Sequence, residues 1–412
     1  MIDTFLAWAQ AFMLQVALAA RSGNNPVVPL ISLFFFLLIL FRGILPLRIP
    51  RSAKAICALP VFLGSFNILI YLSLSRLRER PEDLTLPLTV LSFISSVVIC
   101  WGLLLILQDM LRAVAALSRL IARRCKQNGT AETASPDLSR RRFLVNGGLL
   151  LVAGAAGCVG TRNALGSPEI IPTEILCPRL PAALNGLRIV QLSDLHISDI
   201  LTCAWVRDVV DRVNALRPDL IVVTGDLVDG HPRELMRHVE VLADLRAPYG
   251  VHTCTGNHDF YSGLEDWLPR FRDLGLGVLR NEHLVLNINE VPLTILGLHD
   301  LKESVRGLGP DLKRALAGAP EHSFRILLEH HPQEAPKRAT FTDIMLSGHT
   351  HGGQLVPLSP LVRRANNGFV AGYYPVGNMR LYVSRGTGVW GGLPLRLGVP
   401  AEISLLTLRS AS

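Results

Sequence analysis

Five short apolar runs, each followed directly by a polar motif, constrain this chain more than any other feature. The runs are Leu187–Leu192, Leu220–Thr224, Val251–Thr255, Phe324–Leu328 and Ile344–Leu346. Runs of this kind are typical of buried strands, and the three-and-four spacing of Val206, Val209, Val210 and Val213 predicts a helix between the first two. Strands that alternate with amphipathic helices predict an α/β fold of stacked layers, with its site at the carboxyl ends of the strands.

The motifs that follow these runs carry possible metal ligands. They are Asp194-Leu195-His196, Gly225-Asp226, Gly256-Asn257-His258-Asp259, His330 in front of His331-Pro332, and Gly348-His349-Thr350-His351. One such motif alone is as well explained by a polar turn, but five strand ends can converge on one edge of a sheet. Imidazole and carboxylate groups without cysteine suit Zn, Mn or Fe.

The order D-x-H, GD, GNHD, H and GHTH resembles that of the calcineurin-like metallophosphoesterase superfamily, from about Leu187 to the C-terminus. GNHDFYSG and GHTHGGQ are similar to a bacterial membrane-associated branch of it. The resemblance implies a four-layer α/β-β/α sandwich and two divalent metal ions (Mn, Fe or Zn). It also implies a set of metal ligands: Asp226 between the two ions, Asp194, His196 and His351 on one, and Asn257, His330 and His349 on the other.

The resemblance further implies hydrolysis of phosphodiester or phosphomonoester bonds by a hydroxide that bridges the metals. His258 is left to protonate the leaving group or to stabilise the transition state, and we expect Asp259 to orient it. A purely structural role for His258 is the alternative. Asp229 fits a GDxxD motif, but it fits the start of a helix equally well. His330 is preferred to His331 as a ligand because it stands two residues before Pro332.

The first part of the chain predicts an all-α transmembrane region. Within residues 1–110, the segments Val27–Phe41, Ala55–Leu74 and Leu86–Leu107 have about the length that a bilayer requires, whereas Met1–Ala20 fits a spanning or an interfacial helix. Residues 1–164 hold 17 Lys and Arg against 7 Asp and Glu, and the remainder holds 24 against 26. Basic charge confined to the apolar part is typical of cytoplasmic loops and excludes a nucleic-acid footprint on the globular domain.

Residues 111–142 form a basic linker that the positive-inside bias places in the cytoplasm. It ends in Ser139–Leu144, which resembles a twin-arginine export signal, and residues 143–160 follow as a membrane anchor or signal helix. An ordinary fourth span with a basic flank is the alternative. We therefore expect a multi-pass protein of the cytoplasmic (inner) membrane, with the metallophosphoesterase domain, residues 165–412, on its outer face.

The favoured function is that of a general phosphodiesterase acting outside the cytoplasm. A membrane anchor raises the local concentration of lipid-linked substrates, so a phospholipid or a lipid-linked pyrophosphate is a candidate substrate. The first alternative is the UDP-2,3-diacylglucosamine pyrophosphate hydrolase of lipid A synthesis, which would require the domain on the cytoplasmic face. The alternative from another class is an inactive metal-binding scaffold. None of the motif residues is missing, which favours an enzyme.

Overall fold

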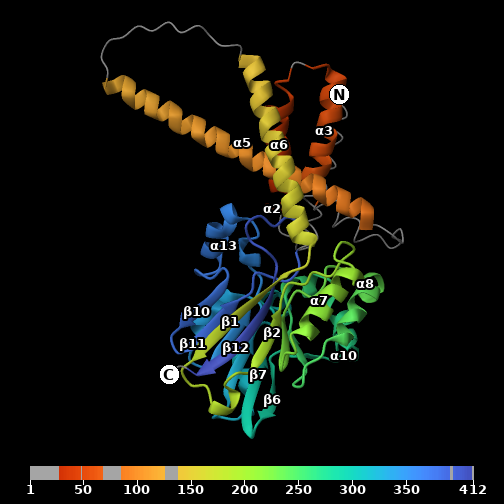
Figure 1. Cartoon of the computed structure of the whole chain (residues 1–412), viewed down its shortest axis with the longest axis vertical. Helices are drawn as coiled ribbons and strands as arrows, with labels where there is room; N and C mark the ends of the chain where they lie inside the picture. Colours follow the sequence, from red (N-terminus) through yellow and green to blue (C-terminus); the bar gives the residue numbers. More distant parts are fainter. Residues whose placement is uncertain (1–26, 48, 68–84, 126–137, 390–392, 411–412) are drawn as a thin grey trace. The chain divides into compact units, whose positions relative to one another are not determined.

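The computed structural model describes residues 27–47, 49–67, 85–125, 138–389 and 393–410 and divides the chain into two compact units, Met1–Thr161 and Arg162–Ser412. The described part of the first unit is helical (Figure 1). Its helices are α2 (Val27–Ile39) with the π-helical turn η1 (Leu40–Ile44), α3 (Arg51–Ser65), α5 (Thr85–Cys125) and α6 (Leu138–Leu165), whose last residues enter the second unit.

Two of these helices are long and apolar enough to cross a membrane, over Leu88–Ser118 in α5 and Leu144–Leu165 in α6. The apolar parts of the other two, Leu30–Ile44 and Ser52–Ser65, are shorter. The span predicted at Leu86–Leu107 therefore lies in a helix of sufficient length. Met1–Ala20 and residues 68–74 of the second predicted span fall outside the described residues, so the number of spans stays a prediction.

The second unit is built on two six-stranded sheets. The first has the order β1 (Glu169–Cys177), β12 (Glu402–Ser410), β2 (Arg188–Leu192), β3 (Leu220–Thr224), β4 (Val251–Cys254) and β5 (Leu276–Val278). The second has the order β10 (Gly372–Val376), β11 (Met379–Val383), β9 (Ile344–Ser347), β8 (Phe324–Leu328), β7 (Val291–Gly297) and β6 (Glu282–Ile288). Strands β2 to β5 are parallel to one another, as are β7, β8, β9 and β11.

The two sheets pack face to face. The residues between them come from both sheets: Ile189, Leu220 and Val222 from the first, and Ile295, Ile326, Leu346 and Tyr382 from the second. This shared apolar layer leaves the other face of each sheet to be covered by helices.

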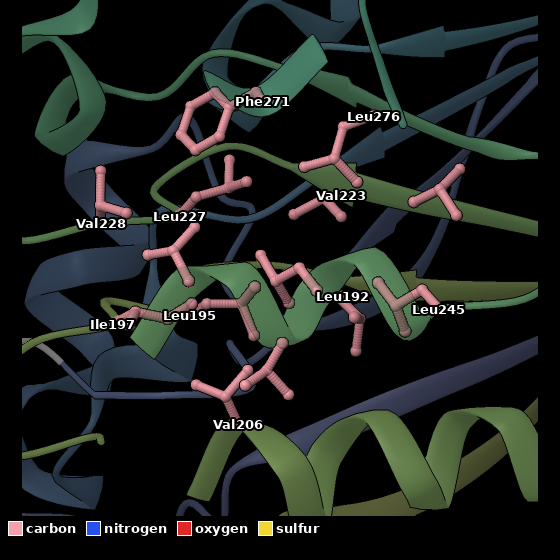
Figure 2. Close-up of a cluster of buried hydrophobic side chains, with 14 of the residues drawn as sticks. Leu192, Leu195, Ile197, Val206, Val223, Leu227, Val228, Leu245, Phe271 and Leu276 are labelled. Carbon is pink, nitrogen blue, oxygen red and sulfur yellow. The ribbon is translucent and has the colours of Figure 1, made fainter. Parts of the chain in front are cut away.

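Helices cover the outer face of the first sheet (Figure 1). They are α7 (Cys203–Ala215), α8 (Pro232–Val239) and α10 (Leu264–Asp273). Val206 of α7 and Phe271 of α10 pack in one cluster with Leu192 and Val223 (Figure 2), and Leu235 of α8 belongs to the same cluster. The helices α11 (Leu312–Leu316) and α12 (Ala335–Arg338) pack on the second sheet through Ala315 and Ala335. The predicted four-layer α/β-β/α sandwich is confirmed.

The predicted strands and helices are largely where the sequence places them. The helix predicted from the valine spacing is α7, and β6 and β7 form an antiparallel hairpin. Helix α8 ends at Val239 and is followed by the 3₁₀ turn η3 (Glu240–Asp244). The sequence pattern does not reveal β1, which is paired in parallel with β12 at the edge of the first sheet and is exposed along much of its length.

Candidate metal centre

The predicted ligands follow the carboxyl ends of five strands, which are β2, β3 and β4 in the first sheet and β8 and β9 in the second. Asp194 and His196 come after β2, Asp226 after β3, Asn257 at the start of α9 (Asn257–Tyr261) after β4, His330 after β8, and His349 and His351 after β9. The structure thus brings predicted ligands from both sheets to one edge of the sandwich, as the strand directions require.

Side-chain atoms of these residues lie at the separations that two ligands of one ion would have. His196 Nε2 is 3.1 Å from His351 Nε2, and His351 Nε2 is 3.4 Å from Asp194 Oδ1. Asp226 Oδ2 lies 3.2 Å from His330 Nε2 and 3.7 Å from His196 Nε2. Ligands held at about 2.0–2.2 Å from a zinc-like ion, at roughly right to tetrahedral angles, are about 3–3.5 Å apart. Asp226 contacts both groups, which fits a carboxylate shared by two ions.

Among the buried atoms at this edge that have no hydrogen-bond partner, two belong to predicted ligands. They are Asn257 Oδ1 and His330 Nε2. A buried polar atom left unpaired costs about 1–3 kcal/mol, so such atoms call for a ligand. An amide oxygen and an imidazole nitrogen both bind divalent ions. The residues present therefore fit a metal centre.

Neighbouring groups hold two of the histidines in the tautomer that a metal ligand requires. His330 Nδ1 lies 2.7 Å from the carbonyl oxygen of Thr224, and His196 Nδ1 lies 3.0 Å from Asp229 Oδ1. Donation from Nδ1 to these oxygens leaves Nε2 as the nitrogen that can bind a metal, and metal-binding histidines usually have such a partner.

The backbone at the ligands is strained. Asp194, His196, Asp226, His349 and His351 have φ between 47° and 69°, a region that non-glycine residues seldom occupy. Such conformations cost about 1–3 kcal/mol each and gather at functional sites, where the surrounding structure enforces them. Five of the seven predicted ligands share this property, which sets them apart from an ordinary polar turn.

Close backbone packing explains two of the glycines. A Cβ atom on Gly256 would collide with the backbone nitrogen and the carboxylate of Asp226, and one on Gly348 would collide with Ser193 and Asp194. Any side chain at these two positions would displace a predicted ligand.

The partner of His258 differs from our expectation, which was Asp259. His258 Nδ1 lies 2.7 Å from Asp229 Oδ1, which also contacts His196. Asp259 instead accepts backbone N–H groups of Gly256, Asp226 and Leu227 at 2.8–2.9 Å. The expectation was wrong because His258 and Asp259 are consecutive in α9, and consecutive helical side chains do not face each other.

The charges in this cluster shift the pKa values of Asp229 and His258. Burial by itself would raise the pKa of Asp229, but His196 and His258 beside it hold that pKa well below its usual range. Burial by itself would lower the pKa of His258, but Asp229 and Asp226 outweigh it and raise the pKa to about 9. Asp229 and His258 therefore form an ion pair when no metal is bound.

Two residues at the centre are not assigned by sequence pattern. Asp229 fits both a GDxxD motif and a helix start, and only its contacts with His196 and His258 decide the matter. Arg396 is fully buried, with Nη2 3.2 Å from His351 Nδ1 and 2.6 Å from the carbonyl oxygen of Gly388. Arg396 lies far from the motifs in the sequence, so no sequence pattern indicated that it would contact His351.

Comparison with known proteins identifies a family. Residues 187–353 match the family model described as calcineurin-like phosphoesterase. A zebrafish (Danio rerio) protein named "Transmembrane protein with metallophosphoesterase domain" is 32% identical over 322 residues, which cover 76% of this chain and 72% of that protein.

Bacterial relatives match as well. A Bacillus subtilis protein named as an uncharacterised metallophosphoesterase is 34% identical over 67% of this chain and 99% of its own length. One from Campylobacter jejuni, named in the same way, is 37% identical over 60% of this chain and 65% of its own. A solved 5′-nucleotidase precursor from Thermus thermophilus aligns at 15% identity with a TM-score of 0.32, a likeness that supports no argument.

Proposed function

Because the chain belongs to the calcineurin-like metallophosphoesterase family, we propose that it is a membrane-anchored phosphoesterase that works with two divalent ions. As a member of this family, the chain is a hydrolase of phosphoric ester bonds. The proposal adds the dinuclear centre, the residues that hold it and the class of substrate.

The observation that carries the proposal is the convergence of seven metal-binding side chains on one edge of the sandwich. We assign Asp194, His196 and His351 to one ion, Asn257, His330 and His349 to the other, and Asp226 to both. The separations of 3.1–3.7 Å between ligand atoms and the unpaired atoms of Asn257 and His330 support this assignment. Manganese, iron and zinc all suit the ligand set.

The two ions, when bound, supply Lewis acidity that acidifies water and offsets the negative charge of phosphate oxygens. The protein supplies the rest. His258 donates a proton to the leaving group, and its side chain is 23% exposed beside the ligands. Asp229 holds Nδ1 of His258 and thereby orients the ring, so that Nε2 exchanges the proton. Asp259 fixes the loops that carry Asp226 and Asn257.

Hydrolysis of p-nitrophenyl phosphate and bis(p-nitrophenyl) phosphate tests the reaction. The full chain in detergent is stripped with a chelator and then supplied with Mn²⁺, Fe²⁺ or Zn²⁺. We expect metal-dependent hydrolysis that Asn257→Ala reduces strongly. An enzyme that binds two ions but hydrolyses neither ester, nor a wider panel of phosphate esters, would favour the scaffold alternative.

One surface feature supports a lipid-linked substrate. Helix α13 (Ser359–Ala365) lies next to the Gly348–Gly353 loop, because Ser359 Oγ donates to the carbonyl oxygen of Gly352 at 3.0 Å. Val356 and Leu361 are 55% and 67% exposed there, and the exposed Arg363 and Arg364 follow. Exposed apolar side chains with basic neighbours suit an anionic lipid surface.

Acidic substitutions in the rim formed by Val356, Leu361, Arg363 and Arg364 test the lipid substrate. In nanodiscs of phosphatidylcholine and phosphatidylglycerol, Leu361→Asp should lower hydrolysis of a lipid phosphate and leave that of bis(p-nitrophenyl) phosphate unchanged. Phe341→Asp is the matched control, since Phe341 is 49% exposed but precedes the amino end of β9. Equal loss on both substrates would argue against a lipid-binding rim. The UDP-2,3-diacylglucosamine alternative is tested by adding that substrate to the same assay.

The side of the membrane is also part of the proposal. Two apolar helices and a relative named as a transmembrane protein support attachment to a membrane. We propose several spans, the basic linker 111–142 in the cytoplasm, the twin-arginine-like Ser139–Leu144 as an export signal, and the domain at 165–412 on the outer face. The side chains of Leu138–Phe143 lie outside the described residues. Protease treatment of spheroplasts should degrade the domain, and protection until the membrane is permeabilised would reverse this assignment.

A further inference from the structure

A carboxylate and an imidazole beside the proposed ligands have no role in the reaction described above. Asp300 follows β7 and begins the 3₁₀ helix η4 (Leu301–Arg306), and His331 follows His330 after β8. Because β7 and β8 are parallel neighbours, both residues reach the same edge of the second sheet. The side chain of Asp300 is fully buried, and that of His331 is 8% exposed.

The two side chains approach each other without forming a hydrogen bond. Asp300 Oδ2 and His331 Nε2 lie 3.0 Å apart, yet both are buried atoms that lack a hydrogen-bond partner. The other oxygen, Asp300 Oδ1, accepts the backbone N–H of Lys302 at 2.7 Å. The two atoms are within ion-pair distance of each other, but a buried atom without a hydrogen bond costs about 1–3 kcal/mol, and a cation between them would satisfy both.

Their separation has a simple geometric meaning. Two atoms that bind one ion at about 2.0–2.2 Å, at roughly a right angle, lie about 3 Å apart and point at the ion rather than at each other. His196 and His351, at 3.1 Å, and Asp226 and His330, at 3.2 Å, show the same spacing. Unpaired atoms also mark the proposed ligands Asn257 and His330.

We propose that Asp300 Oδ2 and His331 Nε2 form a third divalent-cation site next to the dinuclear centre. The site lies beside His349, whose ring centroid is 3.8 Å from that of His331. Ligand atoms of His330, His331 and His349 all lie within 4.8 Å of one another. The third ion would therefore be a close neighbour of the ion that we assign to His330 and His349.

The ligand chemistry predicts a weaker site than the other two. One carboxylate and one imidazole suit Mn²⁺, Fe²⁺ or Zn²⁺, but they leave most coordination positions to water or to a phosphate oxygen. The third ion should bind at higher free metal concentrations than the first two. This inference goes beyond the proposed function, because it does not depend on which ester is hydrolysed.

Metal titration of the full chain tests the site. The protein in detergent is stripped with a chelator and titrated with Mn²⁺, and bound metal is measured by elemental analysis and electron paramagnetic resonance. We expect two tightly bound equivalents and a third, weaker one. Asp300→Asn and His331→Gln should each weaken binding of the third equivalent and retain the first two. Asp300→Asn removes the negative charge but keeps an oxygen that can accept a hydrogen bond from His331. The variant therefore separates metal binding from a simple contact between the two side chains.

His252→Gln is the matched control. His252 is a buried histidine in β4 whose Nε2 lies 2.9 Å from the carbonyl oxygen of Tyr249, and this variant should keep all three equivalents. Two equivalents in the wild type at saturating Mn²⁺ would leave Asp300 and His331 as a simple ion pair and overturn the proposal. Loss of a tightly bound ion in both variants would also overturn it, because the two residues would then belong to the dinuclear centre.

Anomalous diffraction from Mn²⁺-soaked crystals of the wild type gives a second measurement that does not depend on variants. A peak between Asp300 Oδ2 and His331 Nε2 is the expected result. Two peaks at the dinuclear centre with none at this position would refute the third site. Failure of the proposed function would look different, since it would appear as fewer than two tightly bound ions or as absent hydrolysis.

Discussion

Replacement of Asp259 by Asn separates a structural role from a catalytic one. One carboxylate oxygen of Asp259 accepts the N–H groups of Asp226 and Gly256, both at 2.9 Å, and the other accepts those of Leu227 at 2.8 Å and Val228 at 3.3 Å. An Asn side chain keeps one oxygen and turns an NH₂ group towards the remaining two N–H donors. Asp259→Asn should therefore break two of the four hydrogen bonds.

The magnitude follows from these contacts. A buried hydrogen bond to a carboxylate contributes about 1–3 kcal/mol, so the loss of two should lower the free energy of unfolding by about 2–6 kcal/mol. For a domain of this size, each kcal/mol shifts Tm by about 2–4 °C, which predicts a decrease of about 4–24 °C. Because Asp259 ties together the loops that carry Asp226 and Asn257, the affinity for metal should fall as well.

Thermal unfolding of the full chain in detergent, combined with metal analysis, measures both effects. Asp343→Asn is the control, since Asp343 is a buried carboxylate that accepts the backbone N–H of Arg325 at 2.9 Å away from the metal centre. It should cost less stability and leave the metal content unchanged. An Asp259→Asn protein that melts like the wild type, keeps two ions and loses only turnover would refute this reasoning and restore Asp259 as the residue that orients His258.

Three further predictions concern individual carboxylates and the proposed acid. Asp226→Asn should reduce the content of both tightly bound ions in elemental analysis, whereas retention of both would show that Asp226 does not bridge them. His258→Ala should lower turnover about 10²–10⁴-fold at unchanged metal content, with a smaller loss on nitrophenyl esters than on alkyl esters; an equal loss would exclude proton donation. Burial alone would raise the pKa of Glu303, but contacts from His299, Arg280 and Thr255 lower it to about 2. Since the folded pKa is depressed, this stabilisation is fully present above pH about 4.5, and it is lost as the pH falls towards 2. The difference in Tm between the wild type and Glu303→Gln should therefore narrow as the pH falls below about 4.5. A difference that stays constant would contradict the assigned pKa.

Much of the fold and the placement of the candidate metal centre follow from local pattern. Apolar runs of four to six residues predict buried strands, and strands that are parallel bring their carboxyl ends to one edge. The order of strands and motifs is therefore enough to predict that Asp194, Asp226, Asn257, His330 and His349 lie at one edge, and the family resemblance implies their roles as ligands. The exposed strand β1 could not be found in this way, because its side chains lack the continuous apolar pattern of a buried strand.

The contacts around the ligands depended on tertiary structure. The sequence by itself determined that His258 would lie at the site, but its nearest carboxylate along the chain, Asp259, points away from it within α9. Asp229 reaches His258 from the loop after a neighbouring strand, 29 residues earlier in the chain. The pairing of Asp300 with His331 likewise depends on the register of β7 against β8. Side-chain direction and strand register are properties of the packed sheets, so no local pattern of residues reveals them.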